Sequence, residues 1–292
     1  MSDARYHRNV LLFGEEGQRK LRKTKVVIAG VGGLGSPLAQ HMALLGVEEV
    51  GLIDDEELDD TNRNRFIGAR ADDPVPGSPK VALAARLIHE INPHVRTRPC
   101  EHGLVTPESF ELIKAADWVF GCFDEDGPRF VLNEICAAYA KSYVDLASDV
   151  PASGEYGGRI CVSHDGDGCL HCLGLIDEED VNGFLRSADE RARIAAIYGV
   201  PVVALGPTGP SVSPLNGVVA SLAATEFMVA VTGMRKPNRI LQYRGHLGTV
   251  NASRDKPDPD CFYCHGIRGQ KAGADIERYL RIPHLRKARK AY

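Results

Sequence analysis

Short apolar segments alternate with amphipathic ones along the first half of the chain. Lys25 to Gly30 is apolar and β-branched, and apolar residues follow with helical spacing from Leu34 to Leu45. A second apolar run, Glu49 to Ile53, ends at Asp54. Because strands that alternate with helices pair in parallel, this pattern predicts a Rossmann-like, doubly wound α/β sheet.

The same alternation continues to about Ser148. Apolar runs at Trp118 to Cys122 and Tyr143 to Leu146 predict two more strands. Helical spacing predicts helices at Lys80 to Ile91 and at Phe130 to Ala140. The mostly parallel sheet should therefore draw its strands from residues 1–148.

Glycine-rich, extended segments replace this pattern in the second half of the chain. Glu155 to Ser163 and Ile240 to Asn251 predict an antiparallel region continuous with the first sheet, interrupted by a polar helical stretch and a proline-rich loop at Pro201 to Pro214. The longest apolar stretch, Gly217 to Thr232, contains Glu226 and is shorter than the about 20 residues that span a bilayer. We expect a buried helix there, in the core or at a subunit interface.

Three regions follow from these patterns. Residues 1–148 form the Rossmann-like region, residues 149–271 the antiparallel crossover region, and residues 272–292 a C-terminal tail. The tail is predicted to be solvated or partly disordered, because it is rich in basic residues: Arg278, Arg281, Arg286, Lys287, Arg289 and Lys290.

The charge of the chain narrows the choice of partners. A formal net charge of −4 over 292 residues gives no global attraction to nucleic acid or to an acidic membrane, so neither is expected as a partner. The first ten residues carry charges of both signs and lack the apolar core of a secretory signal, which favours a cytoplasmic protein.

A glycine-rich turn joins the first predicted strand to the first predicted helix, with glycines at Gly30, Gly32, Gly33 and Gly35. Glycines at this place let backbone N–H groups approach a phosphate at the N-terminus of a helix. Asp54 ends the second strand, where a carboxylate can accept hydrogen bonds from both ribose hydroxyls. These features predict a nucleotide site, and they fit a nicotinamide dehydrogenase and an ATP enzyme equally.

The next polar residues favour ATP. Asn62, Arg65 and Lys80 form a polar cluster in which Arg65 and Lys80 can neutralise the charge that develops on a leaving pyrophosphate, and a dehydrogenase has no use for such a cluster. The strand Trp118 to Cys122 brings Asp124 to the carboxyl edge of the sheet. A carboxylate there suits Mg²⁺, which prefers one or two carboxylates together with phosphate oxygens.

Taken in order, these motifs resemble the ThiF/MoeB/HesA superfamily, which is related to ubiquitin-activating enzymes. The resemblance extends from about Arg5 to His265 and includes the segment Arg5 to Asn9 and two later Cys-x-x-Cys pairs. It implies that residues 1–148 bind ATP and that the activity is adenylylation. It also implies a homodimer, because Arg8 matches the arginine that reaches the ATP of the partner subunit.

The resemblance further implies a role for each residue of the nucleotide motif. Gly33 and its neighbouring glycines would contact the nucleotide, and Asp54 would hold the ribose. Asn62 would help to grip the phosphates, while Arg65, Lys80 and Asp124, the magnesium ligand, would act in catalysis. Three positions depart from the residues that are usual in the family: Glu56, Phe66 and Glu125.

Eight cysteines in a chain expected to be cytoplasmic suggest metal binding before disulfides. Two pairs with knuckle spacing offer four thiolates, which fill the tetrahedral shell of a structural Zn²⁺: Cys169, Cys172, Cys261 and Cys264. The other thiols lie among apolar neighbours and are expected to be buried and inert: Cys100, Cys122, Cys136 and Cys161. The segment Leu173 to Asp260 has no cysteine, although many relatives carry there a thiol that receives the acyl group.

The function expected is therefore an ATP-dependent adenylyltransferase without a crossover catalytic cysteine. Its substrate would be the C-terminal carboxylate of a small ubiquitin-like or sulfur-carrier protein, or of a peptide. Two alternatives are a nicotinamide (NAD)-dependent oxidoreductase and a non-catalytic module that binds a ubiquitin-like protein. The sequence names neither the acyl substrate nor the final acceptor.

Overall fold

The structure, a computed structural model, describes residues 4–152, 154–187, 190 and 211–286. Its centre is a single eight-stranded sheet with the strand order β3-β2-β1-β4-β5-β6-β7-β8. The strands are β1 (Lys25–Ala29), β2 (Glu49–Ile53), β3 (Arg96–Cys100), β4 (Trp118–Gly121), β5 (Ser142–Ala152), β6 (Glu155–Ser163), β7 (Ile240–Arg244) and β8 (Thr249–Ala252). The sheet is parallel from β3 to β5 and antiparallel from β5 to β8, which confirms the predicted parallel sheet with an antiparallel continuation.

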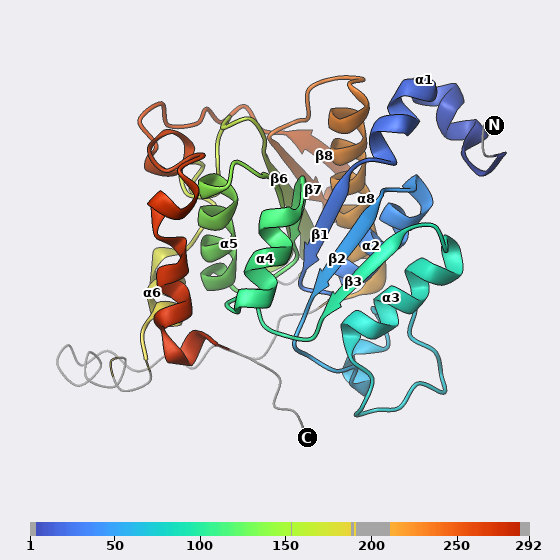
Figure 1. The fold of residues 1–292 in the computed structure, drawn as a ribbon, viewed down its shortest axis with the longest axis horizontal. Coiled ribbons are helices and arrows are strands. Elements are labelled where there is room, and N and C mark those ends of the chain that lie inside the picture. The colour runs from blue at the N-terminus through green and yellow to red at the C-terminus, as the bar shows by residue number, and fades with distance from the viewer. Residues whose placement is uncertain (1–3, 153, 188–189, 191–210, 287–292) are drawn as a thin grey trace.

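Helices cover both faces of this sheet (Figure 1). They are α1 (His7–Leu21), α2 (Gly35–Leu45), α3 (Lys80–Ile91), α4 (Pro107–Ala115), α5 (Asp126–Ala138), α6 (Glu178–Leu185) and α8 (Ser213–Thr232). Short helical turns complete the described chain: η1 (Ala4–Tyr6), η2 (Asp60–Asn62), η3 (Gly245–Leu247), η4 (Phe262–Gly266), η5 (Lys271–Ala274), η6 (Ile276–Arg281) and η7 (Pro283–Leu285).

Alternation along β1 divides the core into two layers. Val26 and Ile28 point to the layer that contains α2, α3 and α8, whereas Val27 and Ala29 point to the layer that contains α4 and α5. Successive side chains of a strand point to opposite faces, so a strand covered by helices on both sides is apolar at every position. This is why β1, β2 and β4 read as continuous apolar runs in the sequence.

Three elements were not predicted, and each has a local reason. The edge strand β3 is mostly polar and contains Pro99, which is tolerated because an edge strand has one unpaired side. Helix α1 is broken at Gly14, whose φ of 75° lies outside the helical region. Helix α4 begins with Pro107 after Thr106, whose hydroxyl accepts a hydrogen bond from the N–H of Ser109.

Several predicted boundaries need correction. Helix α5 starts at Asp126, four residues before the predicted Phe130, and the expected segment Ile240 to Asn251 is a hairpin in which η3 separates β7 from β8. Most of the predicted loop Pro201 to Pro214 lies outside the described residues.

Helix α8 is longer than the apolar stretch suggested. It has 20 residues and, of the described helices, it is the one long and apolar enough to cross a bilayer by length and composition alone. It packs mainly on α1, α2, β5 and β6, and its Phe227 is fully buried against the ring of Phe120 on β4. The carboxylate of Glu226 is also buried and pairs with Arg235. The prediction of a buried helix is therefore confirmed for the face that packs on the sheet.

The prediction of a solvated tail is wrong for its described part, residues 272–286. This segment (red in Figure 1) packs against α5. It buries Ile276, Tyr279 and Leu285 in the layer of α4 and α5. Arg278 donates to both carboxylate oxygens of Glu134, at 2.7 Å each, and the Tyr279 hydroxyl donates to the same carboxylate.

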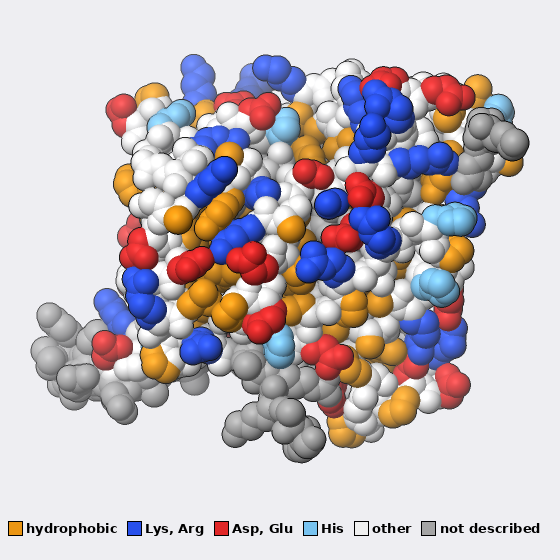
Figure 2. Space-filling view, in the orientation of Figure 1, with side chains coloured by type: hydrophobic (Ala, Val, Ile, Leu, Met, Phe, Trp, Pro, Cys, Tyr) orange, Lys and Arg blue, Asp and Glu red, His pale blue; other side chains and the backbone are white. Residues whose placement is uncertain are grey.

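On the face of the molecule shown in Figure 2, acidic and basic side chains are interspersed.

The anchoring ion pair gives a first prediction. The Glu134 side chain is 5% exposed, so Arg278→Met should leave a buried carboxylate without its cation and lower the free energy of unfolding by about 2 kcal/mol. The control is Arg281→Met, which removes a pair with Asp275 in which both side chains are more than 60% exposed, and a loss below about 0.5 kcal/mol is expected. Urea titration measures both values, and equal losses would contradict the anchoring role.

Candidate functional site

A cleft of about 1350 Å³ opens at the carboxyl edge of the parallel strands. It lies where β1 is flanked by β2 on one side and β4 on the other, which is the switch point of the sheet. The structure brings to this cleft most of the residues that the sequence predicted for a nucleotide: Gly30, Gly32, Gly33, Asp54, Asn62, Arg65, Lys80 and Asp124.

The glycine-rich turn is shaped by close backbone contacts. Gly30 has a φ of 89°, and a Cβ atom there would lie 2.9 Å from the carbonyl oxygen of Cys122. Gly35 does not line the cleft; it is the first residue of α2, and a Cβ atom would lie 2.1 Å from the carbonyl oxygen of Gly30. Gly35 therefore permits close packing of helix and turn, while Gly30, Gly32 and Gly33 face the cleft.

Asp54 is oriented at the end of β2 by two backbone N–H groups. One carboxylate oxygen accepts from the N–H of Val31 at 2.7 Å, and the other accepts from the N–H of Glu56 at 2.9 Å. Burial raises the pKa of Asp54 to about 6, although the charge of Lys80 and the two N–H donors oppose this shift. Each oxygen keeps a lone pair, so an ionised Asp54 can still accept hydrogen bonds from a ligand.

Two of the predicted residues that line the cleft are cationic. Lys80 is buried at the first position of α3, and its Nζ contacts the exposed carboxylate of Glu56, one of the residues that depart from the family pattern. Arg65 donates through Nη1 to the carbonyl oxygen of Thr61 and to the side chain of Asn64. A guanidinium has five N–H donors, so these two bonds leave donors for an anion.

Asp124 is exposed in the cleft, between β4 and α5. Within the described residues it has no ion-pair partner. Asp126, by contrast, pairs with Arg129 and accepts from the N–H of Asp177, and its own N–H donates to Asp180. These bonds fix α6 against the start of α5 and leave Asp124 as an unpaired carboxylate at the edge of the sheet.

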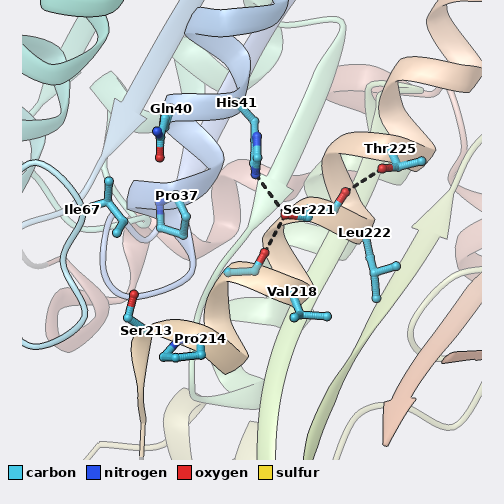
Figure 3. Close-up of a pocket in the computed structure, with 11 residues that line it drawn as sticks. Pro37, Gln40, His41, Ile67, Ser213, Pro214, Val218, Ser221, Leu222 and Thr225 are labelled. Atoms are coloured by element: carbon cyan, nitrogen blue, oxygen red, sulfur yellow. Dashed lines mark hydrogen bonds between the residues drawn. The ribbon is translucent and has the colours of Figure 1, made fainter. Parts of the chain in front are cut away.

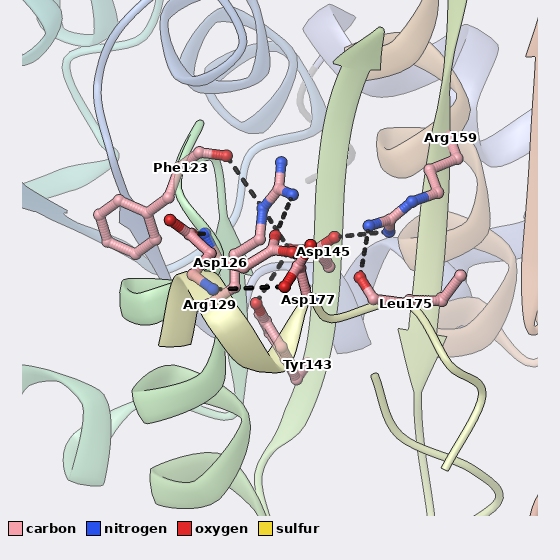
Figure 4. Close-up of polar contacts among 9 residues, drawn as sticks. Phe123, Asp126, Arg129, Tyr143, Asp145, Arg159, Leu175 and Asp177 are labelled. Carbon is pink, nitrogen blue, oxygen red and sulfur yellow. Dashed lines mark hydrogen bonds and ion pairs between the residues drawn. The ribbon is translucent and has the colours of Figure 1, made fainter. Parts of the chain in front are cut away.

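A network of charged side chains next to the start of α5 was not predicted from the sequence (Figure 4). Asp145 is fully buried on β5 and accepts from Arg159 at 2.9 Å and from the Tyr143 hydroxyl at 3.1 Å. Arg129 Nε lies 3.6 Å from the same carboxylate. Arg159 and Arg129 both line the cleft, so Asp145 orients two cations there. The signal available in the sequence was a single acidic residue inside an apolar strand.

Arg8, like Gly35, is a predicted residue that the single chain does not bring to the lining of the cleft. It lies on α1, is exposed and does not line the cleft.

The four predicted metal ligands form one cluster. The Sγ atoms of Cys169, Cys172, Cys261 and Cys264 all lie within 4.8 Å of one another. The pairs Cys169–Cys261 and Cys172–Cys264 have Sγ–Sγ distances of 3.7 and 3.8 Å. A tetrahedral site with Zn–S bonds of about 2.3 Å has edges of about 3.8 Å, so this arrangement fits zinc.

The remaining thiols differ in exposure. Cys100, Cys136 and Cys161 are buried as predicted, but Cys122 is partly exposed and lines the cleft. Burial raises the pKa of Cys122, Cys136 and Cys161, so these three are thiols rather than thiolates at neutral pH.

A smaller cavity of about 480 Å³ lies between α2 and α8 (Figure 3). His41 Nε2 is 3.1 Å from the Ser221 hydroxyl, which donates to the carbonyl oxygen of Gly217. Burial lowers the pKa of His41, so the ring is neutral at pH 7. Because the lining residues include no carboxylate, lysine or arginine, the larger cleft is the candidate nucleotide site.

Comparison with known proteins agrees with this geometry. The adenylyltransferase and sulfurtransferase MOCS3-1 of Zea mays is 29% identical over 89% of this chain, which spans about half (51%) of that relative. The sulfur carrier protein adenylyltransferase of Thermus thermophilus is 26% identical over 94% of this chain and 95% of its own length. The crystal structure of Escherichia coli MccB with ATP shares the fold, with a TM-score of 0.68 and 20% identity over 90% of this chain and 75% of that chain. Residues 6–263 match the ThiF family, and the chain therefore belongs to that family.

Proposed function

We propose that this chain is an ATP-dependent adenylyltransferase that activates a carboxylate as an acyl adenylate. The observation that carries the proposal is that Asp54, Arg65, Lys80 and Asp124 line one cleft together with the glycine-rich turn. Each group has a use in adenylylation: a ribose acceptor, two cations for the phosphates and a carboxylate for Mg²⁺. Membership of the ThiF family supports the same activity.

In the proposed reaction, an oxygen of the substrate carboxylate attacks the α-phosphorus of ATP. The bond from this phosphorus to the oxygen that bridges the α- and β-phosphates breaks, and pyrophosphate leaves with both bonding electrons. Lys80 and Arg65 stabilise the charge that develops on pyrophosphate, while Asp54 fixes the ribose. Asp124 would hold Mg²⁺, which supplies further charge neutralisation when bound.

The acyl substrate is proposed to be the C-terminal carboxylate of a small ubiquitin-like or sulfur-carrier protein, or of a peptide. The cleft is larger than the 300–1,000 Å³ of an ordinary small-molecule site, and it continues past Tyr156 and Arg159 to Tyr243 and Arg244 on β7. An extended tail would fit there beside a nucleotide. The name of the Thermus thermophilus relative and the E. coli MccB structures with ATP and with MccA support substrates of these classes.

The proposed enzyme works as a homodimer in the cytoplasm. Arg8 is exposed on α1 and does not reach the cleft of its own chain, which supports a role across a subunit interface. A monomer in sedimentation experiments at working concentration would contradict this arrangement.

Transfer of the acyl group is proposed to bypass any thioester on this chain. The segment from Leu173 to Asp260 has no cysteine, and the pKa of Cys122, the partly exposed thiol that lines the cleft, is raised by desolvation and by the nearby Asp145 carboxylate. The adenylate would pass directly to an amine, sulfide or thiol of another molecule. A thiol-sensitive adduct in the intact mass, after incubation with ATP and a carrier protein, would overturn this view.

The alternatives from the sequence are less favoured. A nicotinamide-dependent oxidoreductase leaves Arg65, Lys80 and Asp124 without a common use, and the relatives described above are named for adenylylation or sulfur transfer. A non-catalytic binding module would not need an unpaired carboxylate beside two phosphate-binding cations.

The catalytic proposal is tested by Asp124→Ala. Because Asp124 is exposed at the sheet edge, the variant should fold like the wild type, while ATP–pyrophosphate exchange with the acyl partner should fall by about 100-fold or more. Glu178→Ala, at an exposed position of α6 outside the cleft lining, is the control and should exchange normally. Exchange near the wild-type rate in Asp124→Ala would exclude the assigned role.

The raised pKa of Asp54 predicts a pH dependence of nucleoside binding. Adenosine does not titrate between pH 5 and 7.5, so a change in its affinity over this range reports on the protein. The ionised carboxylate is the better acceptor for ribose hydroxyls, and with a pKa of about 6 the wild type should bind adenosine about tenfold more weakly at pH 5 than at pH 7.5. Asp54→Asn should bind weakly at both pH values. Titration calorimetry would refute the assignment if wild-type affinity did not change with pH.

The cysteine cluster is proposed to bind a structural zinc ion, because four thiolates leave no open coordination position. Cys169→Ser should lose stoichiometric zinc and unfold at a lower temperature, since metal binding contributes directly to folding. Cys100→Ser, a buried thiol outside the cluster, should retain the metal. Elemental analysis that finds no zinc in the wild type would show the assignment to be wrong.

A further inference from the structure

Asn216 lies in the nucleotide cleft, although neither the sequence motif nor the proposed mechanism uses it. It belongs to the first turn of α8 and is 1% exposed. Its Nδ2 atom lies over the glycine-rich turn, 2.4 Å from the position that a Cβ atom of Gly33 would occupy. The side chain of Arg65 approaches the same position, at 3.1 Å. A side chain at Gly33 would collide with this amide and crowd the methylene groups of Arg65.

The hydrogen bonds of this amide are incomplete. Nδ2 donates to the Ser211 hydroxyl at 3.0 Å, and Oδ1 is buried without a hydrogen-bond partner in the described part of the chain. A buried amide atom that loses its bonds to water and gains none destabilises the folded state. Buried polar groups in proteins are nearly always paired, so an orphan in a ligand cleft requires an explanation.

An amide nitrogen carries two N–H groups, and the bond to Ser211 uses one of those on Nδ2. Within the described residues no acceptor takes the second. Because Nδ2 lies over the glycine-rich turn, a phosphate oxygen beside Gly33 and Arg65 would accept this hydrogen. The unpaired Oδ1 means that the amide adds little to the stability of the fold, which favours a role in binding.

We propose that Asn216 is an additional nucleotide-binding residue, whose carboxamide donates a hydrogen bond to a phosphate oxygen of ATP while Ser211 orients it. This role rests on the proposed use of ATP. It brings the region that follows the crossover segment into direct contact with the nucleotide, so that the site is built from both halves of the chain.

Asn216→Leu tests this role by separating binding from stability. The variant removes the donor and also the unpaired buried oxygen. Affinity for Mg·ATP should fall by about tenfold or more, because a hydrogen bond to a charged group is lost. Affinity for adenosine, which has no phosphate, should stay within about twofold of the wild type. The melting temperature of the free protein should be unchanged or higher. Asn216→Ala gives the same comparison if leucine is too large for the site.

The matched control is Asn92→Leu. Asn92 is equally buried, but its amide is fully used: Nδ2 donates to the Tyr6 hydroxyl at 2.6 Å and to the carbonyl oxygen of Ala43 at 3.0 Å, and Oδ1 accepts from the N–H of His94. This variant should melt at a lower temperature and bind ATP normally when folded.

Calorimetric titration with Mg·ATP and with adenosine separates the outcomes. Loss of ATP affinity with adenosine affinity retained supports the contact with phosphate. Unchanged ATP affinity in Asn216→Leu and Asn216→Ala, or equal losses for ATP and adenosine, overturns it while leaving the proposed function intact. Absence of ATP binding by the wild type refutes the proposed function, and the role of Asn216 with it.

Discussion

The parallel pairing of β1 with β2 on one side and β4 on the other is the constraint on which the site depends. The connections after β1 and β2 lead to α2 and α3, which pack on one face of the sheet, while α5 follows β4 on the opposite face. Chain segments that leave in opposite directions open a cleft at the carboxyl edge. The close contact between Gly30 and the Cys122 carbonyl closes the floor of this cleft and fixes the turn beside β4.

Three of the cations that line the cleft are paired with carboxylates of the protein itself. Lys80 pairs with Glu56, and Asp145 accepts from Arg159 with Arg129 close by. Such pairing holds buried charged groups in defined orientations, because an unpaired charge at these depths would be costly. The structure thus presents orientated cations without requiring a bound anion to fold.

The sequence predicted the parts of the fold and site that rest on local patterns. Apolar runs on strands buried from both faces gave β1, β2 and β4, and the glycine-rich turn, Asp54 and the cysteine pairs follow from spacing alone. Asn216 could not be found in this way, because it begins an apolar helix far along the chain from Gly33. Asp145 is recognisable only once its partner Arg159 is seen on the adjacent strand. The tail was predicted to be solvated because of its basic residues. Three other side chains of the tail are buried in the core and attach it to the fold: Ile276, Tyr279 and Leu285.

The docked tail changes where the folded unit ends. The family match stops at residue 263, yet η5 and η6 beyond it pack on α5, η7 packs on η6, and His284 and Leu285 line the cleft. His284 also lies 3.1 Å from the carbonyl oxygen of Leu185, at the end of α6. A protein shortened to the limit of the family match would keep Asp54, Lys80 and Asp124. It would, however, expose the apolar surface of α5 and leave the Glu134 carboxylate without its cation. Boundaries for expressing this protein, or for exchanging its regions with those of a relative, therefore belong beyond residue 286.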